Sequence, residues 1–339
     1  MRPEDFQRNF TDLVSARVGG TALACSDQWF AECNNLVKHE EPIFKKDHFI
    51  STGQWMDGWE SRRSFGRRAR IESDLDHDWC VLRLGISGAL HGIDIETTHF
   101  TGNAPLFAAV EGTWATGALQ EDAEWFELLP KSPTAADRHN LLALDEQRPC
   151  THIRLKIYPD GGVARLRTWG RPLLRREHYV PGEILDLASV VLGGRVQQCS
   201  DMFYSSPDNL LMPYVGKNMG DGWETKRRRD EHNDWCIVRL GLKGTIRKVL
   251  IDTAHYLGNY PDHFSLEAAS IDELYTDSNT EWTTVIDKTP LQADLTHLFI
   301  DELLVQPDQQ HTHVRLNIFP DGGISRLRII GEPDWSDTP

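Results

Sequence analysis

Carboxylate and histidine side chains occur at spacings that suit proton transfer. Glu96 lies three residues before His99, and Asp252 lies three residues before His255. A nearby carboxylate can fix the tautomer of an imidazole and raise its basicity, as general acid–base catalysis requires. The alternative is a histidine that is hydrogen-bonded structurally in a β-corner. We predict that these four residues are catalytic.

Arginines gather around two short segments that also carry a tryptophan and a glutamate. Residues 58–63 read GWESRR, and residues 222–229 read GWETKRRR. A guanidinium group binds a carboxylate bidentately and can orient a small anion. In the alternative interpretation the tryptophans are packing anchors in the core and the charged pairs above them are solvated. We predict substrate contacts here from Trp223, Arg227, Arg228, Glu60, Arg62 and Arg63, and a catalytic role for Glu224.

Two further segments place a histidine and an arginine two positions apart. They are His152 with Arg154 and His313 with Arg315. In a β-strand, residues two apart project from the same face of the sheet. A solvent-exposed strand face would also explain such charges. The residues that we add to the predicted substrate-binding set are His152, Arg154, His313, Arg315, Asn103 and Asn259.

These motifs occur twice because the chain contains an internal duplication. We expect repeats at 15–171 and 189–332 and a connector at 172–188, where Pro172 and Pro181 interrupt regular structure. Three pairs of segments match in the same order: DGWESRR from Asp57 with DGWETKR from Asp221, DWCVLRLG from Asp78 with DWCIVRLG from Asp234, and THIRLKIYPDGGVARLRTWG from Thr151 with THVRLNIFPDGGISRLRIIG from Thr312.

Within each repeat the hydrophobic pattern has a period of two, which is typical of β-strands. Ile153, Leu155 and Ile157 alternate with polar residues, and a Pro-Asp-Gly-Gly turn follows at Pro159. Long amphipathic helices are absent from the pattern. The predicted fold class is therefore all-β, a tandem duplication of a jelly-roll β-sandwich.

Composition and charge exclude several classes of partner. The 339 residues carry a formal net charge of −15, which disfavours nucleic acid and anionic membranes. No apolar run approaches the ~18 residues of a membrane-spanning helix. The six cysteines are scattered and the N-terminus lacks the apolar stretch of a secretory signal, so we expect a cytoplasmic protein.

Metal ligands at familiar spacings are scarce. His311 and His313 could ligate a metal from one strand face, but Cys150 occupies the position of His311 in the first repeat. No histidine–cysteine cluster has zinc-finger or zincin spacing, and phosphate-cradling and dinucleotide motifs are absent. We expect no cofactor and no metal ligand, with a divalent metal as the alternative.

In combination the motifs resemble the allantoicase family. The pattern is DGWE-S/T-x-R, then DWC-x-x-RLG, then D/E-T-x-H-F/Y-x-GN-x-P, in two copies over nearly the whole chain. The resemblance implies a pair of galactose-binding-like jelly rolls and a homo-oligomer. It also implies hydrolysis of allantoate to (S)-ureidoglycolate and urea in purine degradation. The site residues are inferred from the residues themselves and not from the resemblance.

The chemistry of allantoate suits the predicted residues. Allantoate is a carboxylate on a carbon that bears two urea groups, and the lone pair of one ureido nitrogen can help to expel the other as urea. Water then captures the acyliminium. We assign the carboxylate clamp to Arg227, Arg228 or Arg315, acid–base catalysis to His255 with Asp252 and Glu224, and orientation of a urea group to Asn259. The equivalents in the first repeat form a second site or serve the domain interface.

Two other functions remain open from the sequence. One is a non-catalytic tandem β-sandwich that binds carbohydrate or another small ligand, for which exposed tryptophans would be expected. The other is a hydrolase of a related ureido acid, which would use the same clamp and acid–base groups.

Overall fold

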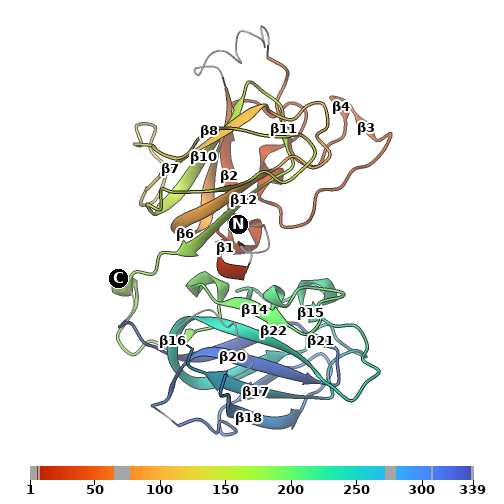
Figure 1. The fold of residues 1–339 in the computed structure, drawn as a ribbon, viewed down its shortest axis with the longest axis vertical. Coiled ribbons are helices and arrows are strands. Elements are labelled where there is room, and N and C mark those ends of the chain that lie inside the picture. Colours follow the sequence, from red (N-terminus) through yellow and green to blue (C-terminus); the bar gives the residue numbers. More distant parts are fainter. Residues whose placement is uncertain (1–5, 7, 65–76, 272–279, 307, 337–339) are drawn as a thin grey trace. The chain divides into compact units, whose positions relative to one another are not determined.

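The protein consists of two β-rich units in the computed structural model, which describes residues 6, 8–64, 77–271, 280–306 and 308–336 (Figure 1). The units are Met1–Leu173 and Leu174–Pro339. Every labelled helix is a 3₁₀ helix of three to five residues. The prediction of an all-β fold is confirmed.

The first unit contains twelve labelled strands. Its elements are β1 (Thr11–Asp12), η1 (Ala16–Val18), β2 (Thr21–Cys25), η2 (Cys33–Val37), β3 (Phe49–Ile50), β4 (Gly53–Gln54), β5 (Trp59–Glu60), β6 (Asp78–Glu96), β7 (Phe107–Thr113), β8 (Phe126–Pro133), β9 (Leu141–Ala143), β10 (Cys150–Tyr158), β11 (Gly162–Val163) and β12 (Arg165–Pro172).

The second unit repeats this series. Its elements are η3 (Arg176–His178), β13 (Leu185–Asp186), η4 (Val190–Leu192), β14 (Arg195–Cys199), η5 (Pro207–Leu211), η6 (Met219–Asp221), β15 (Trp223–Glu224), β16 (Asp234–Asp252), β17 (His263–Ala269), β18 (Thr283–Pro290), β19 (Thr296–Phe299), β20 (Gln310–Phe319), β21 (Gly323–Ile324) and β22 (Arg326–Pro333).

The two units have the same strand topology. The first has the order β1-β12-β6-β10-β7-β8, with β2 and β9 also paired to β6. The second has the order β13-β22-β16-β20-β17-β18, with β14 and β19 also paired to β16. The predicted tandem duplication is confirmed, down to the pairing of the minor strands.

The long strand β6 belongs to both layers of its sandwich. Residues 78–83 pair with β10 on one side and β2 on the other, whereas residues 88–96 pair with β12 and β9. The pairing with β10 is irregular between these two parts, and the strand changes neighbours there. In the second unit β16 is shared between two sets of neighbours in the same way.

The core of the first unit lies between these layers. Ile153, Leu155 and Ile157 of β10 are fully buried and pack in one cluster with Leu82 and Ile95 from the two halves of β6. Apolar side chains at every second position therefore meet in one interior, because alternate residues of a strand face opposite sides. The predicted alternation along 153–157 is confirmed.

Each repeat includes a short edge strand that lies before the start of the aligned segments. β1 pairs with β12, and β13 pairs with β22. Leu13 and Leu187, which follow these strands, have no exposed surface. Residues 185–186 of the expected connector are thus part of the second sheet. In the described residues, no helix has the length and apolar character needed to cross a membrane.

Candidate active site

The motif residues gather where the long strand of each repeat ends. Glu96 is the last residue of β6 and pairs with Arg165 at the start of β12. Asp252 is the last residue of β16 and pairs with Arg326 at the start of β22. Both carboxylate residues are buried. Glu96 and Asp252 therefore occupy equivalent positions at the same end of the two sandwiches.

The predicted catalytic histidines occupy equivalent strained turns. His99 and His255 have φ angles of 72° and 74°, a conformation that is uncommon for residues other than glycine. The backbone N–H of His99 donates to Asp137 at 2.8 Å, and that of His255 donates to Asp294 at 2.7 Å. The same hydrogen bond from the histidine backbone to an aspartate therefore stabilises the turn in both repeats.

The rings of these histidines bond to the backbone and not to the expected carboxylates. Nε2 of His99 lies 3.1 Å from the carbonyl oxygen of Pro42, and Nε2 of His255 lies 2.8 Å from that of Gly216. Because a carbonyl only accepts, the proton of each neutral ring lies on Nε2. The expected pairing with the acid three residues earlier is not formed among the described residues, because the strand ends there and the turn directs each ring to the facing loop.

The predicted asparagines hold the predicted glutamates. Asn103 donates to Glu60 at 2.7 Å, and Asn259 donates to Glu224 at 2.6 Å. Burial raises the pKa of Glu60, and the amide of Asn103 partly offsets that effect. The predicted asparagine and glutamate are thus hydrogen-bonded to each other in both repeats.

The glycine-rich turn that closes this region allows close backbone approach. Gly161 has a φ of 137°, and a Cβ atom there would lie 2.5 Å from the carbonyl oxygen of Asn103. Gly322 has the same role in the second repeat, with a φ of 132°. Only glycine fits such a position without displacing the neighbouring chain.

The motif tryptophans are packing anchors. Trp59 and Trp223 have no exposed surface, and their indole N–H groups donate to the carbonyl oxygens of Asp27 and Asp201 at 2.8 and 2.9 Å. The predicted substrate contact of Trp223 is not supported, because a fully buried ring offers no surface to a ligand.

Most of the predicted substrate-binding arginines in the two GWE segments are already paired. Arg62 binds Asp27 at 2.7 Å, and Arg63 binds Asp160 at 3.0 Å. Arg228 forms ion pairs with Asp230 and Asp234, the second at 2.5 Å. Arg227, in contrast, has an exposed side chain. Of these predicted arginines it is the one that carries no ion pair in the part of the chain described.

The strand-face arginines are neutralised by a glutamate on the neighbouring strand. Arg154 binds Glu111, with Nε at 2.7 Å, and stacks over Trp125. Arg315 binds Glu267 at 2.6 Å and stacks over Trp282. Each arrangement is complete without a ligand. The same contacts recur in both repeats, as expected of a structural device.

The histidines of the same strands are buried. His152 and His313 are 3% and 1% exposed, and each ring Nδ1 lies 2.8 Å from the hydroxyl of the preceding threonine. Burial, together with the positive charge of Arg239, lowers the pKa of His313 to about 4. The expected side-by-side exposure of histidine and arginine is thus wrong for the histidines. Nε2 of His313 lies 3.1 Å from Oε1 of Gln197 on β14.

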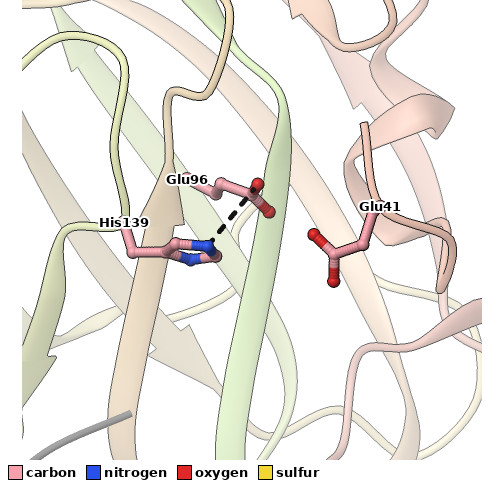
Figure 2. Close-up of side chains that lie close together, drawn as sticks. All are labelled: Glu41, Glu96 and His139. Atoms are coloured by element: carbon pink, nitrogen blue, oxygen red, sulfur yellow. Dashed lines mark ion pairs between the residues drawn. The ribbon is translucent and has the colours of Figure 1, made fainter. Parts of the chain in front are cut away.

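A group that the sequence analysis did not assemble lies in the first repeat. Glu41, Glu96 and His139 each offer a ligand atom, and these atoms all lie within 4.8 Å of one another (Figure 2). Nε2 of His139 is 3.8 Å from Oε1 of Glu96. On the other side of the ring, Nδ1 is 2.7 Å from Oδ2 of Asp94. We call Glu41, Asp94, Glu96 and His139 the first-repeat cluster.

The electrostatics of the first-repeat cluster are unusual. Hydrogen bonding to Asp94 raises the pKa of His139 to about 9, against the opposing effect of partial burial. Burial raises the pKa of Glu96, and the hydroxyl of Thr98, 2.8 Å from Oε1, partly offsets this. Two buried acids therefore face one imidazole, with the exposed Glu41 on the open side.

The second repeat lacks this group. The strand register and the histidine turns align the two repeats residue by residue. The counterparts are Val215 for Glu41, Leu250 for Asp94, Asp252 for Glu96 and Thr296 for His139. Three of the four ionisable groups are absent from the second repeat.

The sequence contained a partial signal for this cluster. Asp94 and Glu96 are two residues apart on one strand, and the second repeat has Leu250 and Asp252 in their place. His139 and Glu41 lie in loops that do not match between the repeats. His139 and Glu41 therefore do not belong to the segments that the two repeats share.

Comparisons with known proteins agree on one family. The model of the allantoicase repeat matches residues 11–173 and 185–334. An allantoicase of Dictyostelium discoideum is 43% identical over 327 residues, which cover 94% of this chain and 86% of that protein. A probable allantoicase of Pseudomonas paraeruginosa is 43% identical, covering 96% and 97% of the two chains.

A solved structure gives the same result. The crystal structure of allantoicase from Saccharomyces cerevisiae has a TM-score of 0.80 and 32% sequence identity, covering 97% of each chain. Sequence repeat, strand topology and full-length similarity therefore converge. The chain belongs to the allantoicase family.

Proposed function

We propose that the chain hydrolyses allantoate to ureidoglycolate and urea, and that the first-repeat cluster is where this occurs. Support for the reaction comes from the family match over both repeats, residues 11–173 and 185–334. Support for the location comes from one observation: Glu41, Glu96 and His139 converge in the first repeat, whereas the second has an apolar or hydroxyl side chain at two of these positions.

The reaction requires water to lose a proton and the departing urea nitrogen to gain one. Glu41 is exposed and can exchange protons with solvent and substrate. Glu96 is held in place by Thr98, and His139 is held by Asp94. Groups fixed in this way lose little entropy when the substrate binds, which favours catalysis by positioning.

The second repeat supplies the competing location. There the set is His255, Asp252 and Glu224, with Arg227 as an exposed cation three residues after Glu224. The exposed His255 keeps Nδ1 available, since its Nε2 proton is donated to Gly216. Asp252 accepts the backbone N–H of Ala254.

Urea release from allantoate by matched variants distinguishes the two locations. We expect Glu96→Gln to lower kcat by roughly 10²–10⁴, the usual contribution of a general acid or base. We expect Asp252→Asn and His255→Ala to retain kcat within a few-fold. The reverse pattern would transfer the proposal to the second repeat. No urea release by the folded wild-type chain would overturn the proposed reaction itself.

The related functions can be tested with the same preparation. A hydrolase of another ureido acid would release urea faster from that acid than from allantoate. A carbohydrate-binding module would need accessible aromatic rings at the motif, and Trp59 and Trp223 have no exposed surface. Comparing the rates of urea release from allantoate and from other ureido acids therefore identifies the preferred substrate.

We also propose a cytoplasmic location and a homo-oligomeric state. All six cysteines are free, as suits a reducing compartment. Met202, Phe203 and Tyr204 are consecutive and more than 60% exposed, which is the kind of apolar surface that self-association covers. Light scattering of the purified chain at micromolar concentration should give a mass above that of one chain.

A further inference from the structure

We propose that the first-repeat cluster binds one divalent transition-metal ion through Nε2 of His139 and the carboxylates of Glu41 and Glu96, with Asp94 as the residue that positions the imidazole. The catalytic consequence of this inference rests on the proposed function, but the binding itself does not. The second repeat should bind no such ion.

The geometry of the cluster is close to that of a ligand set. The three candidate ligand atoms lie within 4.8 Å of one another, and Nε2 of His139 is 3.8 Å from Oε1 of Glu96. Metal–ligand bonds of about 2.0–2.2 Å place neighbouring ligand atoms roughly 3–3.5 Å apart. The side chains of Glu41, Glu96 and His139 point toward one another (Figure 2), and Glu41 is exposed.

Asp94 provides the outer support that metal-binding histidines need. Its Oδ2 is 2.7 Å from Nδ1 of His139, so the Nδ1 proton is donated to Asp94 and the Nε2 edge of the ring faces Glu96. A carboxylate behind an imidazole orients the ring and raises its basicity as a ligand. Asp94 is a buried residue of the strand and is not itself one of the three ligands.

The cluster also contains two buried carboxylates, Asp94 and Glu96, against a single imidazole, His139. Asp94 is 4% exposed, and its Oδ1 has no hydrogen-bond partner in the described residues. Glu96 is 1% exposed, and in that same part of the chain its carboxylate has no ion pair with a lysine or arginine. Burying a carboxylate is costly unless it is paired or coordinates a metal. A bound cation would remove that cost.

One side of the cluster is open. The side chain of His139 is 50% exposed, and Glu41 is exposed. Three protein ligands with open positions characterise catalytic rather than structural metal sites. Two oxygens and one imidazole nitrogen, without thiolate, favour ions such as Mn²⁺ or Zn²⁺ over soft ions such as Cu⁺.

The proposed site supplies the water that the reaction consumes. A metal ion lowers the pKa of a bound water towards neutrality. A bound ion would present that water to the central carbon of allantoate, where it would capture the acyliminium left after urea departs. Glu41 would protonate the departing nitrogen and regain its proton from that water, so urea leaves neutral and ureidoglycolate keeps the oxygen of water.

Direct titration of the metal-stripped full-length chain with Mn²⁺ tests the binding, with the free ion measured by electron paramagnetic resonance. We expect one tight site per chain in the wild type. Glu41→Gln, Glu96→Gln and His139→Gln should abolish it, and Asp94→Asn should weaken it by roughly 10- to 100-fold. Glu121→Gln and His178→Gln change exposed residues elsewhere and should bind as the wild type does.

Two outcomes would overturn the metal site. The first is no tight binding of Mn²⁺ or Zn²⁺ by the wild type. The second is unchanged binding by Glu41→Gln and His139→Gln, whose substituted side chains are exposed and therefore spare the fold. Urea release that persists in either case leaves the proposed function standing. Tight binding by a chain that releases no urea with the ion bound would overturn the proposed function and keep the site.

Discussion

The two repeats share their scaffold and differ in their chemistry. Both have a long strand that joins two layers, a histidine in a left-handed turn, a glutamate held by an asparagine and a buried arginine–aspartate pair. Among the described residues, only the first gathers two buried acids, an exposed acid and an imidazole at the strand end. Residues that both repeats keep include some that each fold requires, such as the buried Arg165 and Arg326. Residues found in one repeat alone are better candidates for catalysis.

The largest expected effect comes from making the first repeat like the second. His139→Thr introduces the residue that occupies the equivalent position, Thr296. We expect kcat for urea release to fall by roughly 10²–10⁴, because the imidazole is lost. Thr296→His, in the second repeat, should leave kcat within two-fold. Full activity of His139→Thr would show that the difference between the repeats has no catalytic meaning.

The next largest effect is a loss of stability when the buried arginine–aspartate pair of either repeat is broken. Arg165 binds Asp57 at 2.7 Å and Arg326 binds Asp221 at 3.1 Å, and both arginines are buried. Removing one partner leaves a buried charge, so Arg165→Met and Arg326→Met should each lower the free energy of unfolding of their repeat by about 3–5 kcal/mol. Denaturant unfolding followed by circular dichroism measures this. A large loss in one repeat and none in the other would contradict a common scaffold role.

A smaller effect is a dependence of the stability of the second repeat on pH. The pKa of His313 is about 4 in the folded chain against 6.5 for an ordinary histidine, so the unfolded chain binds the proton more tightly. The second repeat should therefore lose up to about 3 kcal/mol of stability as the pH falls from 6.5 to 4. His313→Gln removes this dependence. The unfolding free energies of the wild type and of His313→Gln, measured across that interval, should converge at low pH. A difference that stays constant with pH would be inconsistent with a neutral buried histidine.

The smallest effect tests one aromatic substitution between the repeats. Tyr256 donates its hydroxyl to the carbonyl oxygen of Met219 at 2.6 Å, and the first repeat has Phe100 at the equivalent position. We expect Tyr256→Phe to cost about 1 kcal/mol, the net value of one hydrogen bond. Thermal unfolding would detect it. An unchanged midpoint would mean that water replaces the hydroxyl.

The sequence predicted the fold well because the fold depends on local periodicity and on repetition. The alternation at 153–157 and the turn at Pro159 identify strands, and the duplication identifies the architecture. The repeat limits at 15–171 and 189–332 stay a prediction, but β1 and β13 precede them. Those strands have two residues each, too few for any period to be recognised.

The site was predicted only in part. Glu96 was found because it stands beside His99 in a motif, yet its partner in the structure is His139. His139 comes from the loop before β9, and Glu41 from the loop after η2. Their proximity depends on how two loops close over one strand end, and no spacing along the chain encodes that. The burial of His152 and His313 was missed for a similar reason, since a strand pattern does not say which neighbours cover its face.

Because β6 is shared between two layers, the position of its residues Asp94 and Glu96 depends on the folding of the whole repeat. A strand that has partners on both sides at residues 80–83 and 92–94 can exchange the amide protons of these segments only when both neighbours separate from it. Asp94 and Glu96 lie at the end of that strand. Their backbone amides should therefore be among the last in the repeat to take up deuterium, and any opening that disorders this strand end should cost nearly as much as global unfolding.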